Sequence, residues 1–135
     1  MKFTLPKKER LKSKKDIQNI FSKGSSVFIY PFQVIYLLID SSVAPKHKIM
    51  ISVPKKRWKR SVDRNLIKRL SREAYRLNKN LLADISIEKQ IQIALIYTGD
   101  KILPYKTIEE KIILILHRLN EIHEKSYSKH NNSSR

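Results

Sequence analysis

Residues 62–81 constrain the fold most, because their pattern predicts one long helix with two different sides. Wound at about 100° per residue, the segment places its large apolar side chains in a single arc that Ile67 and Ala74 flank. That apolar arc consists of Val62, Leu66, Leu70, Leu77 and Leu81. The opposite side carries four cations at four-residue spacing, here called the basic row: Arg64, Lys68, Arg72 and Arg76, with Asn65, Arg69, Tyr75 and Lys79 beside them. The apolar arc predicts burial against a second layer, and the basic row predicts a solvent-facing surface.

Extended segments on both sides of this helix predict a sheet. Residues 25–40 are rich in β-branched and aromatic side chains, and Pro31 interrupts them. Pro31 is expected to mark a bulge, an edge strand or a break between two extended pieces. A loop at 41–47 leads to a strand at 48–53, and these strands are expected to pair as an antiparallel hairpin. The strand at 90–97 is apolar on both faces in its second half, which is typical of a central strand.

Capping patterns predict one further helix at each end of the chain. Ser13 and Asp16 have the spacing of a capping box, and Gly24 offers a stop, so the first helix is expected at about 13–22. Thr107 begins a similar pattern that continues to about residue 124. The expected fold is an α/β (α+β) two-layer sandwich, with three helices on a sheet of about four strands in the order α-β-β-β-α-β-α. Residues 1–125 form its single domain, and 126–135 are expected to be a flexible polar tail.

The net charge of +17 is concentrated in two stretches of the chain. Residues 1–23 hold eight basic and two acidic side chains, and residues 55–79 hold eleven basic and two acidic ones. Concentrated positive charge attracts a polyanion by releasing its counterions, so nucleic acid is the first partner expected and an anionic membrane surface the second. No apolar run approaches the roughly 20 residues of a membrane span. The chain has no cysteine, which favours a reducing, cytoplasmic setting.

Side chains that could perform catalysis are sparse. Gly24 and Gly99 are the only glycines, which excludes glycine-rich phosphate loops. The acidic pair Glu109 and Glu110 falls in the first turn of a predicted helix, where the helix dipole accounts for it. The histidines lack the spacing that places two ligands on one metal, and we interpret them as surface side chains: His47, His117, His123 and His130. The sequence therefore predicts no catalytic side chain and no protein metal site.

The basic helix resembles the signature of the bacterial ribonuclease P protein family. The family's pattern is Arg-Asn-Arg, then Ile-Lys-Arg, then two residues and Arg, and this chain has Arg64-Asn65-Leu66, Ile67-Lys68-Arg69 and Arg72, with Lys55 and Lys56 upstream after a strand. The beginning is also similar, with Arg10-Leu11 followed by Asp16, Phe21 and Gly24. The resemblance covers about residues 5–120.

This resemblance implies a protein subunit that binds a catalytic RNA and the 5′ leader of precursor tRNA, and so promotes endonucleolytic removal of the leader. The RNA carries the chemistry, with Mg²⁺ held mainly by the RNA, and the complex contains one protein and one RNA. A left-handed β-α-β crossover is also implied. The implied RNA-binding residues are Lys55, Lys56, Arg64, Asn65, Lys68, Arg69 and Arg72. The charge pattern adds Arg76 from the basic row and Arg60 from the basic run before the helix. The implied leader-binding residues are Phe21, Ile17 and Ile35.

The sequence departs from the family's pattern at three positions. Leu66 takes the place of the second arginine in Arg-Asn-Arg, Ile17 that of a frequent phenylalanine, and Ile35 that of a tyrosine found in some members. Strand parity puts Ile35 on one face with Gln33 and Leu37, and we expect that face to receive the leader.

Two questions stay open at this point. The first concerns Trp58 and Tyr75, which could stack on bases or pack within the fold. The second concerns function, because a general or ribosomal RNA-binding protein without a role in tRNA processing would share the basic row.

Overall fold

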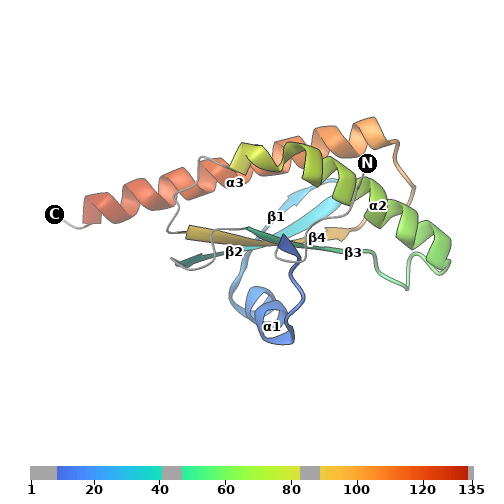
Figure 1. The fold of residues 1–135 in the computed structure, drawn as a ribbon, viewed down its shortest axis with the longest axis horizontal. Coiled ribbons are helices and arrows are strands. Elements are labelled where there is room, and N and C mark those ends of the chain that lie inside the picture. Colours follow the sequence, from blue (N-terminus) through green and yellow to red (C-terminus); the bar gives the residue numbers. More distant parts are fainter. Residues whose placement is uncertain (1–8, 41–46, 83–88, 134–135) are drawn as a thin grey trace.

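The computed structural model describes residues 9–40, 47–82 and 89–133. Its elements follow the predicted order (Figure 1). They are α1 (Lys14–Lys23), β1 (Ser25–Ile29), β2 (Phe32–Asp40), β3 (Lys48–Ser52), α2 (Ser61–Asn78), a 3₁₀ turn η2 (Lys79–Leu82), β4 (Lys89–Tyr97) and α3 (Tyr105–Ser133). Pro31 lies in the two-residue turn between β1 and β2, after a cis peptide bond, so of the three expected alternatives the break between two extended pieces is the one observed.

The four strands form one mixed sheet in the order β1-β2-β4-β3. β4 is central, as predicted, and pairs antiparallel with β2 and parallel with β3. β1 and β2 form an antiparallel hairpin, but the expected pairing of β3 with the preceding strands is wrong. The reason is the intervening α2, which returns the chain alongside β3 as β4 and so allows parallel pairing. The hand of this crossover stays a prediction.

Helices lie on both faces of the sheet, with α2 and α3 on one face and the short α1 on the other (Figure 1). The main core lies beneath α2 and α3, where Phe32 and Val34 of β2 are fully buried. Alternate side chains of β4 and the inner side of α3 complete this core: Ile91, Ile93, Leu95, Ile108, Ile112, Ile115 and Leu116. A smaller cluster joins α1 to the opposite face, with Ile20 and Ala94 at its centre. The predicted sandwich of three helices and a four-stranded mixed sheet is confirmed.

The start of α1 is capped as predicted. Ser13 is the N-cap, and its hydroxyl accepts a hydrogen bond from the backbone N–H of Asp16 at 3.4 Å. Gly24 follows the last residue of the helix with an ordinary φ of −71°, so no left-handed backbone requires glycine. The requirement is space, because a Cβ at Gly24 would lie 2.3 Å from the Ile20 carbonyl oxygen and 2.9 Å from Cγ2 of Ile35. Gly24 therefore allows the end of α1 to approach β2 closely.

The last helix is longer than the sequence pattern predicts. It begins at Tyr105 rather than after Thr107, and the backbone N–H of Ile108 bonds to the carbonyl of Pro104. It continues to Ser133, so residues 126–133 are helical, and the flexibility expected of this segment stays a prediction. The polar composition suggested a tail, but residues 105–133 contain neither glycine nor proline to end a helix. None of the described helices is long and apolar enough to cross a membrane.

The buried side of α2 differs from the predicted apolar arc. The buried side chains are Ile67, Ser71, Ala74 and Tyr75, whereas Val62 is 65% exposed and Leu77 is 51% exposed. Small side chains at 71 and 74 let the helix backbone pack closely, and the Ser71 hydroxyl donates to the Ile67 carbonyl at 2.8 Å, so its burial leaves no unpaired donor.

Leu66 is consequently half-buried at the edge of α2 instead of lying in the core. Tyr75, which the sequence left open between base stacking and packing, is a core residue with 2% of its surface exposed. Its position rules out direct stacking on a base in this conformation.

Candidate nucleic-acid interface

The outward side of α2 presents amide and cationic side chains that lie opposite the buried side. Asn65, Arg69 and Arg72 are exposed, and Lys68 is half-buried beside them. Here these four residues are called the exposed α2 face. Among the described residues, no hydrogen bond or ion pair engages the guanidinium groups of Arg69 and Arg72. Planar guanidinium groups with free donors can bind phosphate oxygens through two hydrogen bonds each.

The ends of the predicted basic row make contacts within the protein. Arg64 Nη1 donates to the backbone carbonyls of Trp58 at 2.7 Å and Lys59 at 3.0 Å, so it fastens the loop before α2. Arg76 forms an ion pair with Glu73 at 2.9 Å, and the hydrogen bonds that its guanidinium donates to the Glu73 carboxylate raise the pKa of Arg76. The two middle residues of the basic row, Lys68 and Arg72, therefore have more donors available for an external ligand than the two end residues.

The loop between β3 and α2 adds cations beside the helix N-terminus. Lys55 and Lys56 are exposed, and Arg60 is also exposed, 3.8 Å from the Asp63 carboxylate. Such a solvent-exposed pair contributes little, about 0–1 kcal/mol, so Asp63 does not hold Arg60 away from a stronger ligand. The loop cations and the exposed α2 face together form one positively charged region.

Trp58 fixes this loop to the sheet. Its indole Nε1 donates to the Gly99 carbonyl at 3.2 Å, and its ring lies edge to face with Tyr97 at a centroid distance of 6.2 Å. The neighbouring Arg57 Nη1 donates to the Thr98 carbonyl at 2.8 Å. These contacts support the packing interpretation of Trp58.

The three predicted leader-binding residues lie where α1 meets the sheet. Ile17 and Ile35 are half-buried in the cluster around Ile20, and Phe21 is 48% exposed. Phe32 and Val34 point to the opposite face and are fully buried under the other helices. The expected choice of the Ile35 face as the accessible one agrees with this arrangement, and leader binding itself stays a prediction.

The described residues offer no protein-based metal centre. They contain no group of three His, Cys, Asp or Glu side chains that could hold a metal ion. His47 accepts a hydrogen bond from the Ile91 backbone N–H at 3.1 Å, and His117 is exposed on α3. His123 and His130 lie outside the residues whose side chains are described. A magnesium ion would therefore find no cluster of three such ligands among the described side chains.

Apart from Arg76, the described side chains with a clearly shifted pKa are three tyrosines that pack within the fold. Burial raises the pKa of Tyr75 and of Tyr97, and the Tyr97 hydroxyl donates to the Lys101 carbonyl at 2.6 Å. Burial and then the neighbouring Glu109 carboxylate raise the pKa of Tyr105 to about 12. These phenols stay protonated at neutral pH and lie outside the exposed α2 face.

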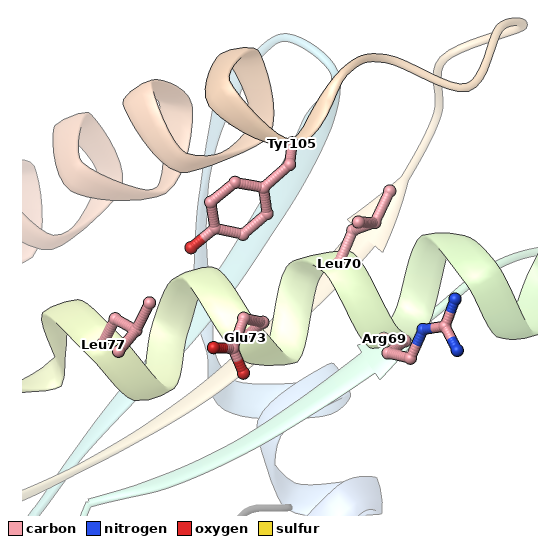
Figure 2. A pocket seen from close by; sticks show the side chains of 5 residues that line it. All are labelled: Arg69, Leu70, Glu73, Leu77 and Tyr105. Atoms are coloured by element: carbon pink, nitrogen blue, oxygen red, sulfur yellow. The ribbon is translucent and has the colours of Figure 1, made fainter. Parts of the chain in front are cut away.

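The sequence did not predict the groove between α2 and α3, because Leu70 and Leu77, which line it, were expected to lie in the core. It is lined by Arg69, Leu70, Glu73, Leu77 and Tyr105 (Figure 2). The Tyr105 hydroxyl donates to the Glu109 carboxylate at 3.2 Å, so the ring forms a fixed wall. Arg69 connects this groove to the exposed α2 face.

An arginine-rich helix face beside a basic loop, on a small α+β sandwich, defines an RNA-binding protein. The family model described as Ribonuclease P matches residues 5–120. The ribonuclease P protein component of Porphyromonas gingivalis (strain ATCC 33277) is 42% identical over 109 residues, which cover 79% of this chain and 80% of that protein. The corresponding protein of Petrotoga mobilis is 30% identical over 119 residues, 86% of this chain and 95% of the relative.

Solved structures agree with the sequence relatives. The RNase P protein from Thermotoga maritima has a TM-score of 0.64 at 27% identity and covers 82% of this chain and 96% of its own. The Staphylococcus aureus RNase P protein has a TM-score of 0.62 at 25% identity, with coverage of 85% and 97%. The chain belongs to the ribonuclease P protein family, and it is a subunit of a ribonucleoprotein that processes the 5′ ends of tRNA.

Proposed function

We propose that the exposed α2 face and the loop cations Lys55, Lys56 and Arg60 bind the catalytic RNA of ribonuclease P. The observation that carries this proposal is the pair of exposed guanidinium groups on α2, at Arg69 and Arg72, which make no hydrogen bond or ion pair within the described residues. In this proposal Arg64 and Arg76 also contact the RNA, and they do so while keeping their hydrogen bonds within the protein.

The second part of the proposal concerns the substrate. The accessible sheet face beside α1, with Phe21, Ile17 and Ile35, binds the 5′ leader of precursor tRNA. Phe21 offers a ring that is 48% exposed, and the two isoleucines supply an apolar floor. Lysines along α1 neutralise leader phosphates and so bring substrate to the RNA active centre, which is a positioning effect.

The third part assigns the chemistry to the RNA. The RNA subunit holds Mg²⁺ and hydrolyses the phosphodiester, and one protein acts as a monomer with one RNA. In support, the described side chains contain no group of three His, Cys, Asp or Glu side chains that could hold a metal ion. A setting in the cytoplasm follows from the sequence expectation and stays a prediction.

Reconstitution tests the proposal directly. Purified protein, the cognate RNA subunit and precursor tRNA are mixed at low Mg²⁺ concentration, and release of the 5′ leader is measured over time. The protein is expected to stimulate cleavage because it supplies cations that otherwise come from the salt. A protein that binds the RNA without any effect on cleavage would be the general RNA-binding protein of the alternative interpretation.

A further inference from the structure

One row of side chains crosses the whole sheet on the face that carries α1. The strand registers pair Phe28 of β1 with Gln33 of β2, Gln33 with Ile96 of β4, and Ile96 with Ser52 of β3. Directly paired residues point to the same face of a sheet, so these four side chains form one line, here called the open row. Four strands about 4.8 Å apart make this line roughly 14 Å long.

Helix α1 covers the adjacent row and leaves the open row accessible. The adjacent row contains Ile35, Ala94 and Met50, which pack against α1 in the cluster around Ile20. In the open row, Phe28 is 60% exposed and Gln33 is exposed, whereas Ile96 and Ser52 are half-buried. The accessible part of the face is therefore a strip beside α1.

The two ends of the open row differ in chemistry. Beyond Ser52 the chain leads through Val53 and Pro54 into the exposed lysines 55 and 56. At the other end Phe28 stands on the edge strand, edge to face with Tyr30 at a centroid distance of 6.4 Å, and the Tyr30 ring is itself 47% exposed. The strip thus runs from cations at one side to a pair of aromatic rings at the other.

This combination fits a single-stranded nucleic acid. Phosphates are attracted to the cations, and any unpaired base can stack on an exposed ring, because every base has a π-face. A second copy of the chain is the other occupant that an exposed aromatic edge could suggest. The net charge of +17 makes two copies repel each other, and so favours the polyanion.

We propose that Phe28 stacks on a base of the 5′ leader and that the Gln33 side-chain amide hydrogen-bonds the edge of that base or its neighbour. This proposal rests on leader binding by the Ile35 face and extends it from α1 to the β1 edge. Tyr30 is a positioning residue, since its edge-to-face contact orients the Phe28 ring. The leader consequently crosses the strands from β3 towards β1.

The test uses the reconstituted holoenzyme and two precursor tRNAs, one with a long leader and one whose leader is trimmed to a single nucleotide. Equilibrium binding gives the ratio of the two affinities for each variant. Phe28→Ala is expected to lower the advantage of the long leader by about fivefold or more, the range for loss of one stacked base. Phe28→Trp is expected to restore it, because the indole offers a larger stacking surface.

Matched measurements separate the possible outcomes. Leu114→Ala removes a side chain of α3 that is 52% exposed, away from the sheet face, and should keep the wild-type ratio. If Phe28→Ala also keeps that ratio, the proposal is wrong. If the wild-type holoenzyme shows no advantage of the long leader, leader binding itself fails, which is a different result. A shift from dimer to monomer on Phe28→Ala in sedimentation would assign the edge to a second copy and overturn the proposal.

Gln33 is tested by leader sequence. Gln33→Ala should flatten the differences in affinity among leaders that vary at one position, while the mean affinity changes less. Uniform weakening for all four bases would show that Gln33 makes no base contact. Thermal unfolding of each variant checks that the exposed substitutions leave the fold intact.

Discussion

Removal of the two free arginines on α2 is the sharpest test of the RNA interface. The double variant Arg69→Ala, Arg72→Ala takes away two exposed side chains that have no described partner in the protein. Alanine is also the best helix former, so the stability of α2 should change by no more than about 0.5 kcal/mol. The variant therefore separates RNA binding from folding.

The size of the effect follows from counterion release. Each lost phosphate contact lowers the slope of log affinity against log salt by about 0.7–0.9, so two contacts lower it by about 1.4–1.8. When the salt concentration rises fourfold, the affinity of the wild type should fall by a factor that is about 7 to 12 times larger than the factor for the variant. At low salt, where released counterions matter most, the variant should bind the RNA subunit more weakly.

Filter binding or fluorescence titration with the RNA subunit at several salt concentrations measures this slope. The matched control is Arg118→Ala, which removes an exposed arginine of α3 outside both basic stretches. A double variant with the wild-type slope would refute the assignment of the exposed α2 face to phosphate binding. A slope change in the control that is half that of the double variant, and so equal for each charge removed, would show that the effect is general to surface charge.

Three further predictions concern the fold. Ile67→Ala should lower the free energy of unfolding by about 2–5 kcal/mol, while Val62→Ala should change it by about 0.5 kcal/mol or less, in urea denaturation; the reverse order would contradict the described rotation of α2. Gly24→Ala should destabilise by about 1–3 kcal/mol, because its Cβ meets a backbone oxygen at 2.3 Å, and an unchanged melting temperature would exclude that close approach. The pKa of Tyr105 is raised from 10.0 to about 12 by burial and then by Glu109, so its contribution to stability is complete below pH 10 and is lost as pH rises towards 12. Urea unfolding of the wild type and Tyr105→Phe across this range should show a smaller loss in the variant, and identical losses would exclude Tyr105 as the source.

The sequence pattern predicted most of the element order because the local signals agreed with the final packing. Ser13 and Gly24 bound α1 within a residue of the expected limits, and the apolar stretch at 90–97 identified the central strand. The partner of β3 was mispredicted because pairing between strands far apart in the sequence leaves no local signal. The extension of α3 past residue 124 was mispredicted because the polar composition was given more weight than the absence of glycine and proline from residues 105–133.

The exposed α2 face was predictable in composition but not in rotation. The positions of the large apolar side chains predicted that the leucines of α2 face the sheet. The observed buried side instead includes Ser71 and Ala74, whose small side chains permit close approach. That error also hid the groove beside Leu70 and left Tyr75 among the candidate base contacts. The intramolecular bonds of Arg64 depend on the path of the preceding loop, which spacing within the helix does not specify.

The central position of β4 has a consequence for synthesis on the ribosome. β4 is the last strand to be made, yet it supplies the hydrogen-bonding partners of both β2 and β3. A nascent chain that ends before residue 89 consequently holds a separate hairpin and an unpaired β3, with two open strand edges. The cationic helix α2 leaves the ribosome before the sheet beneath it can close, so α2 can pack on its complete sheet only after the strand that follows it has emerged.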